Sequence, residues 1–198
     1  IYVTNWGTFN VHKRPAGAPE IDNFGRGAGR KNFPIPRNYS IRGSGDVHPP
    51  SINIYSRTAG GDTAPLRVIS GPKTQLNWPT AVTVDSKRGE IFVANDTGDS
   101  VIVFKSDAHG DVAPIRVIKG PKTMIKNPTG VALDLKNNEL WVANFGNHTA
   151  TVFPIGASGN VAPKRMIRSV PLNEPSLGIG NPHPVAYDSK REEILVPN

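Results

Sequence analysis

Short apolar runs of about four to six residues alternate with polar turns along most of the chain. The runs are rich in Val, Ile and aromatic residues, which favour β-strands. Asp, Asn and Gly stand between them, as in 85–89 and 134–138, and accept tight hairpin geometry at low cost. No useful length of sequence shows the apolar period of a helix, so we expect an all-β fold. One set of four runs is Gly130–Leu133, Leu140–Asn144, Thr149–Phe153 and Lys164–Ile167.

The four-run unit repeats. A shift of 49 residues aligns 71–119 with 120–168 without a gap, and 22 of the 49 positions are identical. Pro65, Pro114 and Pro163 precede the fourth run of each copy, and Pro is tolerated at the start of a strand or on an edge. The fourth run is therefore expected to be the outermost strand. Four antiparallel strands at this period are typical of a β-propeller blade.

The copies extend beyond these two complete repeats. Residues 51–71 match 100–120 at the same offset, and 169–198 begin a further blade, with five extra residues near 172–180. We therefore expect residues 1–198 to be a single, partial propeller domain holding about three blades. Propellers close with about four to eight blades. The ring would be completed by missing sequence or by other chains.

The residues of one copy resemble a known repeat. Residues 127–134, 139–144 and 146–153 are similar to NHL-like or YVTN-type repeats of secreted bacterial propellers. The resemblance implies a propeller fold of about six or seven blades and a periplasmic or extracellular location, in a family that includes binders, scaffolds and a few enzymes. The period is longer than the usual NHL unit. We expect the extra length, Gly156 to Pro163, to form a rim loop.

The positive charge of the chain is local. Of the net charge of +7, residues 6–50 carry +4, and they form an insertion with 41 extra residues inside the first blade. Basic residues suit an acidic surface and aromatic residues anchor interfaces, so we expect a partner-binding arm for other proteins of a larger complex. A solvated loop is the alternative. The predicted contact residues are Lys13, Arg14, Arg26, Arg30, Lys31, Arg37, Phe24, Phe33 and Tyr39.

Several other classes of site find little support. The chain has no cysteine, which removes disulfides and thiolate chemistry. No apolar stretch is long enough to predict a transmembrane segment. Because only the insertion is basic, we do not expect a nucleic-acid partner. The chain starts at Ile1 without Met, which we interpret as a processed or partial chain.

Some polar residues recur in every copy, which favours a structural role over a catalytic one. Aspartates end the first strand and asparagines end the second, where they can cap turns and join blades by hydrogen bonds. Arg67, Arg116 and Arg165 are interpreted as surface residues of the outer strand. The recurring structural positions are Asp85, Asp134, Asp188, Asn5, Asn95, Asn144 and Asn198.

One histidine differs from its counterparts. His183 opens an innermost strand, where the other copies have Thr80 and Thr129. A few NHL-like lyases place metal-binding histidines at this kind of position, so the resemblance makes His183 a candidate ligand. A catalytic metal needs about three protein ligands, and the chain offers one at this level. We therefore predict no cofactor, with Ca or Zn in the channel as the open alternative.

Three functions remain from this reading. The first is a non-catalytic scaffold or recognition module, with no catalytic residue, whose insertion contacts partner proteins. The second is a metal-dependent enzyme of the lactonase or lyase type that acts on a small molecule in the central channel. A propeller that binds a small ligand or a sugar is a third reading.

Overall fold

A computed structural model describes residues 1–5, 49–168, 171, 179 and 182–197. They fall almost entirely within one compact unit, Ile1–Trp6 with Pro50–Asn198. The second unit, Gly7–Pro49, lies almost wholly outside the described residues. Within the described part, no helix is long and apolar enough to cross a membrane.

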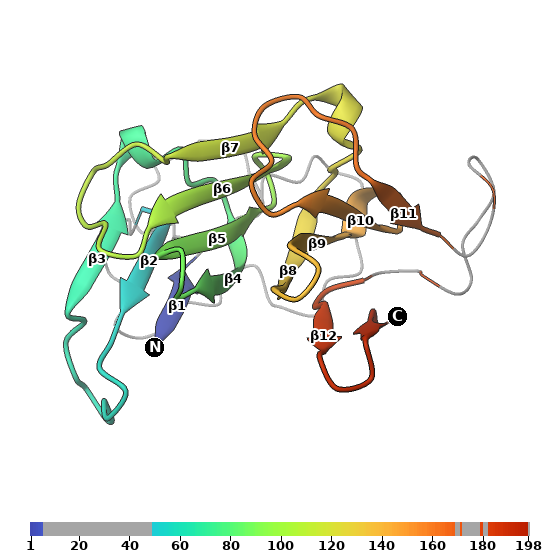
Figure 1. Cartoon of the computed structure of the whole chain (residues 1–198). Coiled ribbons are helices and arrows are strands. Elements are labelled where there is room, and N and C mark those ends of the chain that lie inside the picture. Colours follow the sequence, from blue (N-terminus) through green and yellow to red (C-terminus); the bar gives the residue numbers. More distant parts are fainter. Residues whose placement is uncertain (6–48, 169–170, 172–178, 180–181, 198) are drawn as a thin grey trace, which may run out of the picture. The chain divides into compact units, whose positions relative to one another are not determined.

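In the described residues, thirteen strands form four antiparallel sheets, which we call sheets I to IV (Figure 1). Sheet I has three strands, sheets II and III have four each, and sheet IV has two. Sheet I contains β1 (Tyr2–Asn5), β2 (Ser51–Ile54) and β3 (Arg67–Ser70). Sheet II contains β4 (Pro79–Asp85), β5 (Glu90–Asn95), β6 (Ser100–Lys105) and β7 (Arg116–Lys119). Sheet III contains β8 (Pro128–Asp134), β9 (Glu139–Asn144), β10 (Thr149–Pro154) and β11 (Arg165–Ile167), and sheet IV contains β12 (Ala186–Asp188) and β13 (Glu193–Leu195).

The strands follow chain order across each sheet, so the fourth run is the outer strand, as predicted. The prediction of an all-β fold with four-stranded antiparallel blades is confirmed. The links between sheets hold single 3₁₀ turns, η1 (Pro72–Thr74) and η2 (Pro121–Thr123), and a third, η3 (Phe145–Asn147), follows β9.

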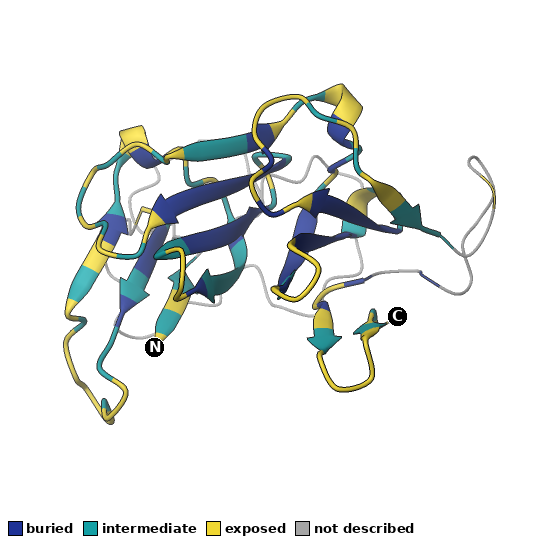
Figure 2. Ribbon diagram, in the orientation of Figure 1, coloured by how far each residue is buried: buried dark blue, intermediate teal, exposed yellow. Residues whose placement is uncertain are grey.

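Each complete sheet has two apolar faces. Its central strands are continuous apolar runs, and neighbouring residues of a strand point to opposite sides of the sheet. We call the face toward the preceding sheet the leading face and the face toward the following sheet the trailing face. In sheet II, Ile91 pairs with Phe104 on the leading face, and Phe92 pairs with Val103 on the trailing face. All four are at most 1% exposed, and Figure 2 shows the buried residues concentrated in the central strands.

The core forms where a trailing face packs on the next leading face. The contact of sheets I and II joins Ile52, Ile54 and Ile69 to Ile91, Val93, Ile102 and Phe104. The contact of sheets II and III joins Phe92, Ala94, Val101, Val103 and Ile118 to Val131, Leu140, Val142 and Phe153. The contact of sheets III and IV joins Ala132, Trp141, Ala143, Ala150 and Val152 to Val185, with Ile194 and Val196 at its margin.

The prediction that Gly156 to Pro163 forms a rim loop needs a correction, because part of this segment pairs with another sheet. The link between β10 and β11 returns to the preceding sheet, where Gly159 forms a parallel bridge with Ile118 of β7. Its equivalent, Gly110, forms the same bridge with Ile69 of β3. The extra length therefore pairs with the outer strand of the neighbouring sheet, whose edge would otherwise present unpaired backbone groups.

Leu140→Ala tests the packing of sheet II on sheet III. Leu140 is fully buried, so we expect the free energy of unfolding in urea to fall by about 2–5 kcal/mol. Leu135→Ala, at a position 44% exposed in a turn, should change it by less than about 0.5 kcal/mol. Equal effects of the two substitutions would contradict the assigned core.

Candidate functional site

The predicted partner-binding residues of the insertion all lie outside the described residues. What the structure describes is the hairpin from which the insertion emerges. Asn5 pairs with Ser51 across that hairpin, as Asn95 pairs with Ser100 and Asn144 with Thr149 in the next two sheets. The insertion therefore joins two strands whose pairing is the same as in the uninterrupted copies.

The recurring aspartates close the turns between first and second strands. Asp85 Oδ1 accepts hydrogen bonds from the backbone N–H groups of Lys87 and Arg88, at 2.9 and 3.0 Å. Arg88 also pairs with Asp85 Oδ2 at 2.8 Å. The same backbone contact joins Asp134 to Asn137, at 2.9 Å. Asp188 Oδ1 likewise accepts hydrogen bonds from the backbone N–H groups of Lys190 and Arg191, at 2.9 and 3.2 Å.

The recurring asparagines connect each second strand to the link that precedes its sheet. Asn95 is 2% exposed, accepts the Asn77 N–H at 2.6 Å and donates to the Gln75 carbonyl at 3.0 Å. Asn144 accepts the Lys126 N–H at 3.3 Å. These buried side chains satisfy backbone groups of the links, which is a structural use of a polar residue. Asn198 lies outside the described residues.

Two arginines of the outer strands also form ion pairs, which adds to their interpretation as surface residues of those strands. Arg116 forms a bidentate pair with Glu90, at 2.6 and 2.8 Å. Arg165 forms the equivalent pair with Glu139, at 2.8 and 2.6 Å, and Lys164 adds a third contact at 2.5 Å. The signal in the sequence was the recurrence of both partners: Glu90 and Arg116 each reappear 49 residues later.

The guanidinium groups of these arginines also lie close to aromatic rings. The guanidinium of Arg165 lies 5.1 Å from the centre of the Trp141 ring, and that of Arg116 lies 5.8 Å from the Phe92 ring. Arg67 has no such acid pair in the described residues, and donates at 2.8 Å to the Ser106 carbonyl of the following sheet. The outer strands are thus held both within and between sheets.

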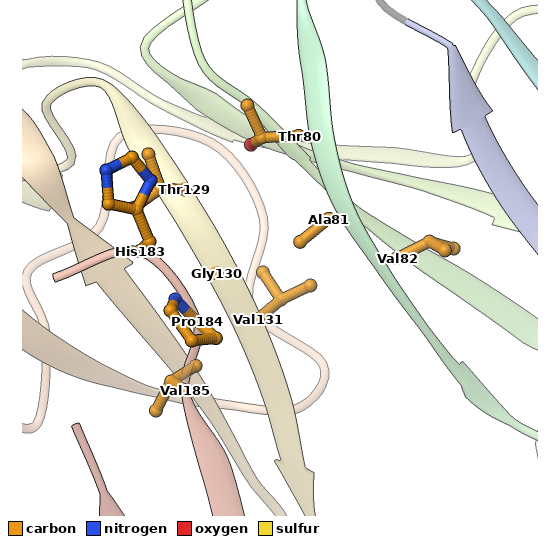
Figure 3. A pocket seen from close by; sticks show the side chains of 9 residues that line it. All are labelled: Thr80, Ala81, Val82, Thr129, Gly130, Val131, His183, Pro184 and Val185. Carbon is orange, nitrogen blue, oxygen red and sulfur yellow. The ribbon is translucent and has the colours of Figure 1, made fainter. Parts of the chain in front are cut away.

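A shallow pocket of about 410 Å³ lies along the innermost strands (Figure 3). Its walls come from three consecutive copies of the first strand or the segment leading to it. Thr80 Oγ1 donates to the Pro128 carbonyl at 2.9 Å, and Thr129 Oγ1 donates to the Pro182 carbonyl at 2.5 Å. These hydroxyls therefore join the inner strands to one another. The lining residues are Thr80, Ala81, Val82, Thr129, Gly130, Val131, His183, Pro184 and Val185.

His183 takes the place of these threonines in the fourth copy. It is exposed, and its ring lies 5.4 Å from the Phe145 ring at an angle of 51°. Nearby, burial raises the pKa of Asp96, whose carboxylate accepts a hydrogen bond from Asn127 Nδ2 at 2.9 Å. Among the residues with described positions, no three His, Cys, Asp or Glu side chains are grouped to hold a metal. Among the described residues, His183 lines the wall of the pocket.

Comparison with known families identifies the repeat. The model described as "NHL repeat" matches residues 126–153, which span β8, β9 and nearly all of β10. Residues 126–153 are an NHL repeat. The match covers the first three strands of sheet III. Sheet II has a related sequence, because residues 71–119 and 120–168 are identical at 22 of 49 positions. No curated protein matches the chain.

Solved structures similar to the chain include three large proteins. Hydrazine synthase of Kuenenia stuttgartiensis is 16% identical over 64% of the chain, with a TM-score of 0.47. A chain of a nidogen/laminin complex is 17% identical over 62%, with a TM-score of 0.44. A proposed 6-phosphogluconolactonase from Bacteroides uniformis is 14% identical over 75%, with a TM-score of 0.49. The chain spans 31%, 40% and 43% of the lengths of these three proteins.

Glu139→Gln tests the outer-strand ion pair. The hydrogen bond from Arg165, followed by the contact with Lys164, holds the pKa of Glu139 below its ordinary value of 4.5. A carboxyl group with a lowered folded-state pKa stabilises the fold above its unfolded-state pKa, and this stabilisation is lost as the pH falls through the folded-state pKa. We expect the variant to lose about 1–3 kcal/mol of unfolding free energy at pH 7.

Urea unfolding of wild type and Glu139→Gln at several pH values checks this. The difference between the two should shrink as the pH falls below 4.5. Glu193 is the matched control, because it occupies the same position in sheet IV and is exposed. A pH-independent difference, or an equal effect of Glu193→Gln, would show that the Glu139 carboxylate is not stabilised by Arg165.

Proposed function

We propose that this chain is part of an NHL-type propeller that acts as a protein-binding scaffold, with residues 6–50 as its partner-contacting arm. The observation that carries the proposal is the register of the β1–β2 hairpin. Asn5 and Ser51 pair as Asn95 and Ser100 do, although 45 residues replace the four-residue turn 96–99. A long connection on a rigid pair of strands is a common way to present a binding segment.

The charge distribution supports a binding role for the arm. The arm carries seven basic and three acidic residues, whereas several conspicuous charges of the sheets are paired in ion contacts. A concentrated positive charge accelerates association with an acidic partner surface and sets its orientation. Phe24, Phe33 and Tyr39 within the same segment provide the apolar anchors that such interfaces use.

The polar residues that recur in the sheets support a scaffold rather than a catalyst. The aspartates close turns, the asparagines hold links, and the Glu–Arg pairs fasten outer strands. Each of these groups already has hydrogen-bond partners within the framework. A scaffold requires this rigidity, because the arm can be presented in a defined place only if the hairpin beneath it is fixed.

Replacing the arm provides the direct test. In the variant, residues 6–50 are exchanged for Asp-Thr-Gly-Asp, the turn that joins β5 and β6. Because the flanking register already matches, thermal unfolding should change little. Binding to immobilised poly-L-glutamate, used as an acidic surface, should fall by at least about tenfold, and wild-type binding should weaken as salt is added.

A second pair of variants controls for net charge. Substituting six basic residues by Ser, either in the arm or on the sheets, lowers the net charge from +7 to +1 in both cases. Only the arm variant should lose binding. Equal losses would indicate general electrostatic attraction and would refute a localised arm. The arm set is Lys13, Arg14, Arg26, Arg30, Lys31 and Arg37, and the sheet set is Arg57, Lys73, Lys87, Lys119, Lys122 and Lys190.

The pocket favours a second candidate, a metal-dependent propeller enzyme acting on a small molecule. His183 lines the pocket where Thr80 and Thr129 stand in other copies, and an imidazole can ligate zinc. If this candidate holds, the purified chain binds Zn or Ca in equimolar amount by elemental analysis, and His183→Thr abolishes the binding. Equal metal content in wild type and variant would remove His183 as a ligand.

A further inference from the structure

Sheets II and III each contact the preceding sheet through a latch, the segment between their third and fourth strands. Gly110 donates its N–H to the Val68 carbonyl at 2.6 Å and accepts the Ser70 N–H at 3.2 Å. One repeat later, Gly159 donates to the Val117 carbonyl at 2.7 Å and accepts the Lys119 N–H at 3.2 Å. The latch thus adds a short parallel strand to the outer edge of its neighbour.

A side chain next to each latch glycine fixes the turn beyond that edge. Asp111 Oδ1 accepts the N–H of Lys73 at 2.7 Å, and Asn160 Oδ1 accepts the N–H of Lys122 at 2.8 Å. The receiving turns begin with Gly71 and Gly120, at φ 128° and 125°. A Cβ at either glycine would lie 2.5 Å from the side chain of Asp111 or Asn160. The Gly-Pro-Lys turn is therefore shaped to receive the latch.

Sheet I has the same latch with nothing bound to it. Gly61 and Asp62 precede Gly110 and Asp111 by 49 residues, and Gly61 keeps the positive φ, at 58°. Gly61 and Asp62 are both exposed, and no hydrogen bond among the described residues involves the Gly61 N–H or the Asp62 carboxylate. The amide of Gly61 and the carboxylate of Asp62 are thus placed as in the engaged copies but face open space.

The leading face of sheet I is also uncovered. Val3 and Val68 flank Asn53 in one row across the sheet. Their counterparts, Val93 and Val117, pack against sheet I in the core between sheets I and II. In sheet I the apolar residues of this face are exposed: Ile1 by 56%, Val3 by 44%, Leu66 by 68% and Val68 by 36%.

We propose that sheet I is a docking surface for a further sheet of this same repeat. The trailing face of that sheet covers Val3 and Val68, its outer strand pairs with Gly61, and the turn after that strand is Gly-Pro-Lys, whose Lys N–H binds the Asp62 carboxylate. Both described latches bind the outer strand of a preceding sheet and the Gly-Pro-Lys turn after it. Gly61 and Asp62 repeat the sequence of Gly110 and Asp111, and Gly61 shares the positive φ of both latch glycines.

The chemistry of the partner distinguishes it from a second copy of this chain. The two Gly-Pro-Lys turns of the described sheets are already occupied, by Asp111 and Asn160. After β11 the equivalent positions hold Ser169, Val170 and Pro171, so no Gly-Pro-Lys sequence follows the third outer strand. A second copy therefore has no free partner for Asp62.

The chain supplies its own probe, because one period can be duplicated in register. Residues 91–139 are fused directly before Ile1, so that Glu139 precedes Ile1 as Glu90 precedes Ile91. The added segment brings a trailing face, an outer strand and a Gly-Pro-Lys turn. Amide hydrogen exchange of Gly61 should slow by at least about tenfold relative to the unextended chain, because its N–H gains a hydrogen bond.

Asp62→Ala separates the specific latch from general packing. In the extended chain it should speed Gly61 exchange and lower the unfolding midpoint, and in the unextended chain it should change neither. Asp107→Ala is the control, since Asp107 is an exposed aspartate in the corresponding link of sheet II. Unprotected Gly61 in the extended chain, or an added segment that stays unfolded, would overturn the proposal. Concentration-dependent protection in the unextended chain would also overturn it and would identify a second copy as the occupant.

Discussion

The packing of a trailing face on the next leading face is the interaction on which this structure depends. A four-stranded sheet with Ile, Val and Phe on both sides is not stable alone, because each face exposes apolar surface to water unless another sheet covers it. Sheet II is covered on both sides, and nine of its apolar residues are at most 1% exposed as a result. The fold is therefore a property of neighbouring repeats rather than of any single sheet.

The polar groups of the repeat serve this packing. Asn95 and Asn144 hold the links that set the position of each sheet, and the Asp85 and Asp134 turns end the strands without leaving backbone donors unpaired. The latches complete the arrangement at the outer edge. Through Gly110 and Gly159 each sheet covers the edge of its neighbour, and the order of contacts has a fixed direction along the chain. A scaffold built in this way leaves the connection between β1 and β2 free to vary in length.

Much of the fold could be predicted from the sequence, because a strand pattern that recurs at 49 residues fixes strand number, order and sheet boundaries together. The expected run Leu140–Asn144 differs from β9 by one residue, Glu139. The latch could not be predicted in the same way. The segment around Gly159 has few apolar residues and resembles a loop, because its pairing uses backbone atoms and a partner in another sheet. The Glu139–Arg165 pair was missed for a similar reason, since its members lie 26 residues apart. The candidate partner residues were chosen from local charge and aromatic content, and those patterns do not specify geometry.

Hydrogen exchange at Gly110 and Gly159 in the unmodified chain tests the central claim most directly. If the sheets are joined as described, both amides are hydrogen-bonded to the preceding sheet and should exchange on the timescale of the central strands β5 and β9. The amide of Gly61, in the equivalent latch of sheet I, has no hydrogen bond among the described residues and provides the unprotected reference within the same molecule. Exchange of Gly110 and Gly159 as fast as that of Gly61 would contradict the account, because the segments would then be solvated loops and the sheets would lack their outer connection.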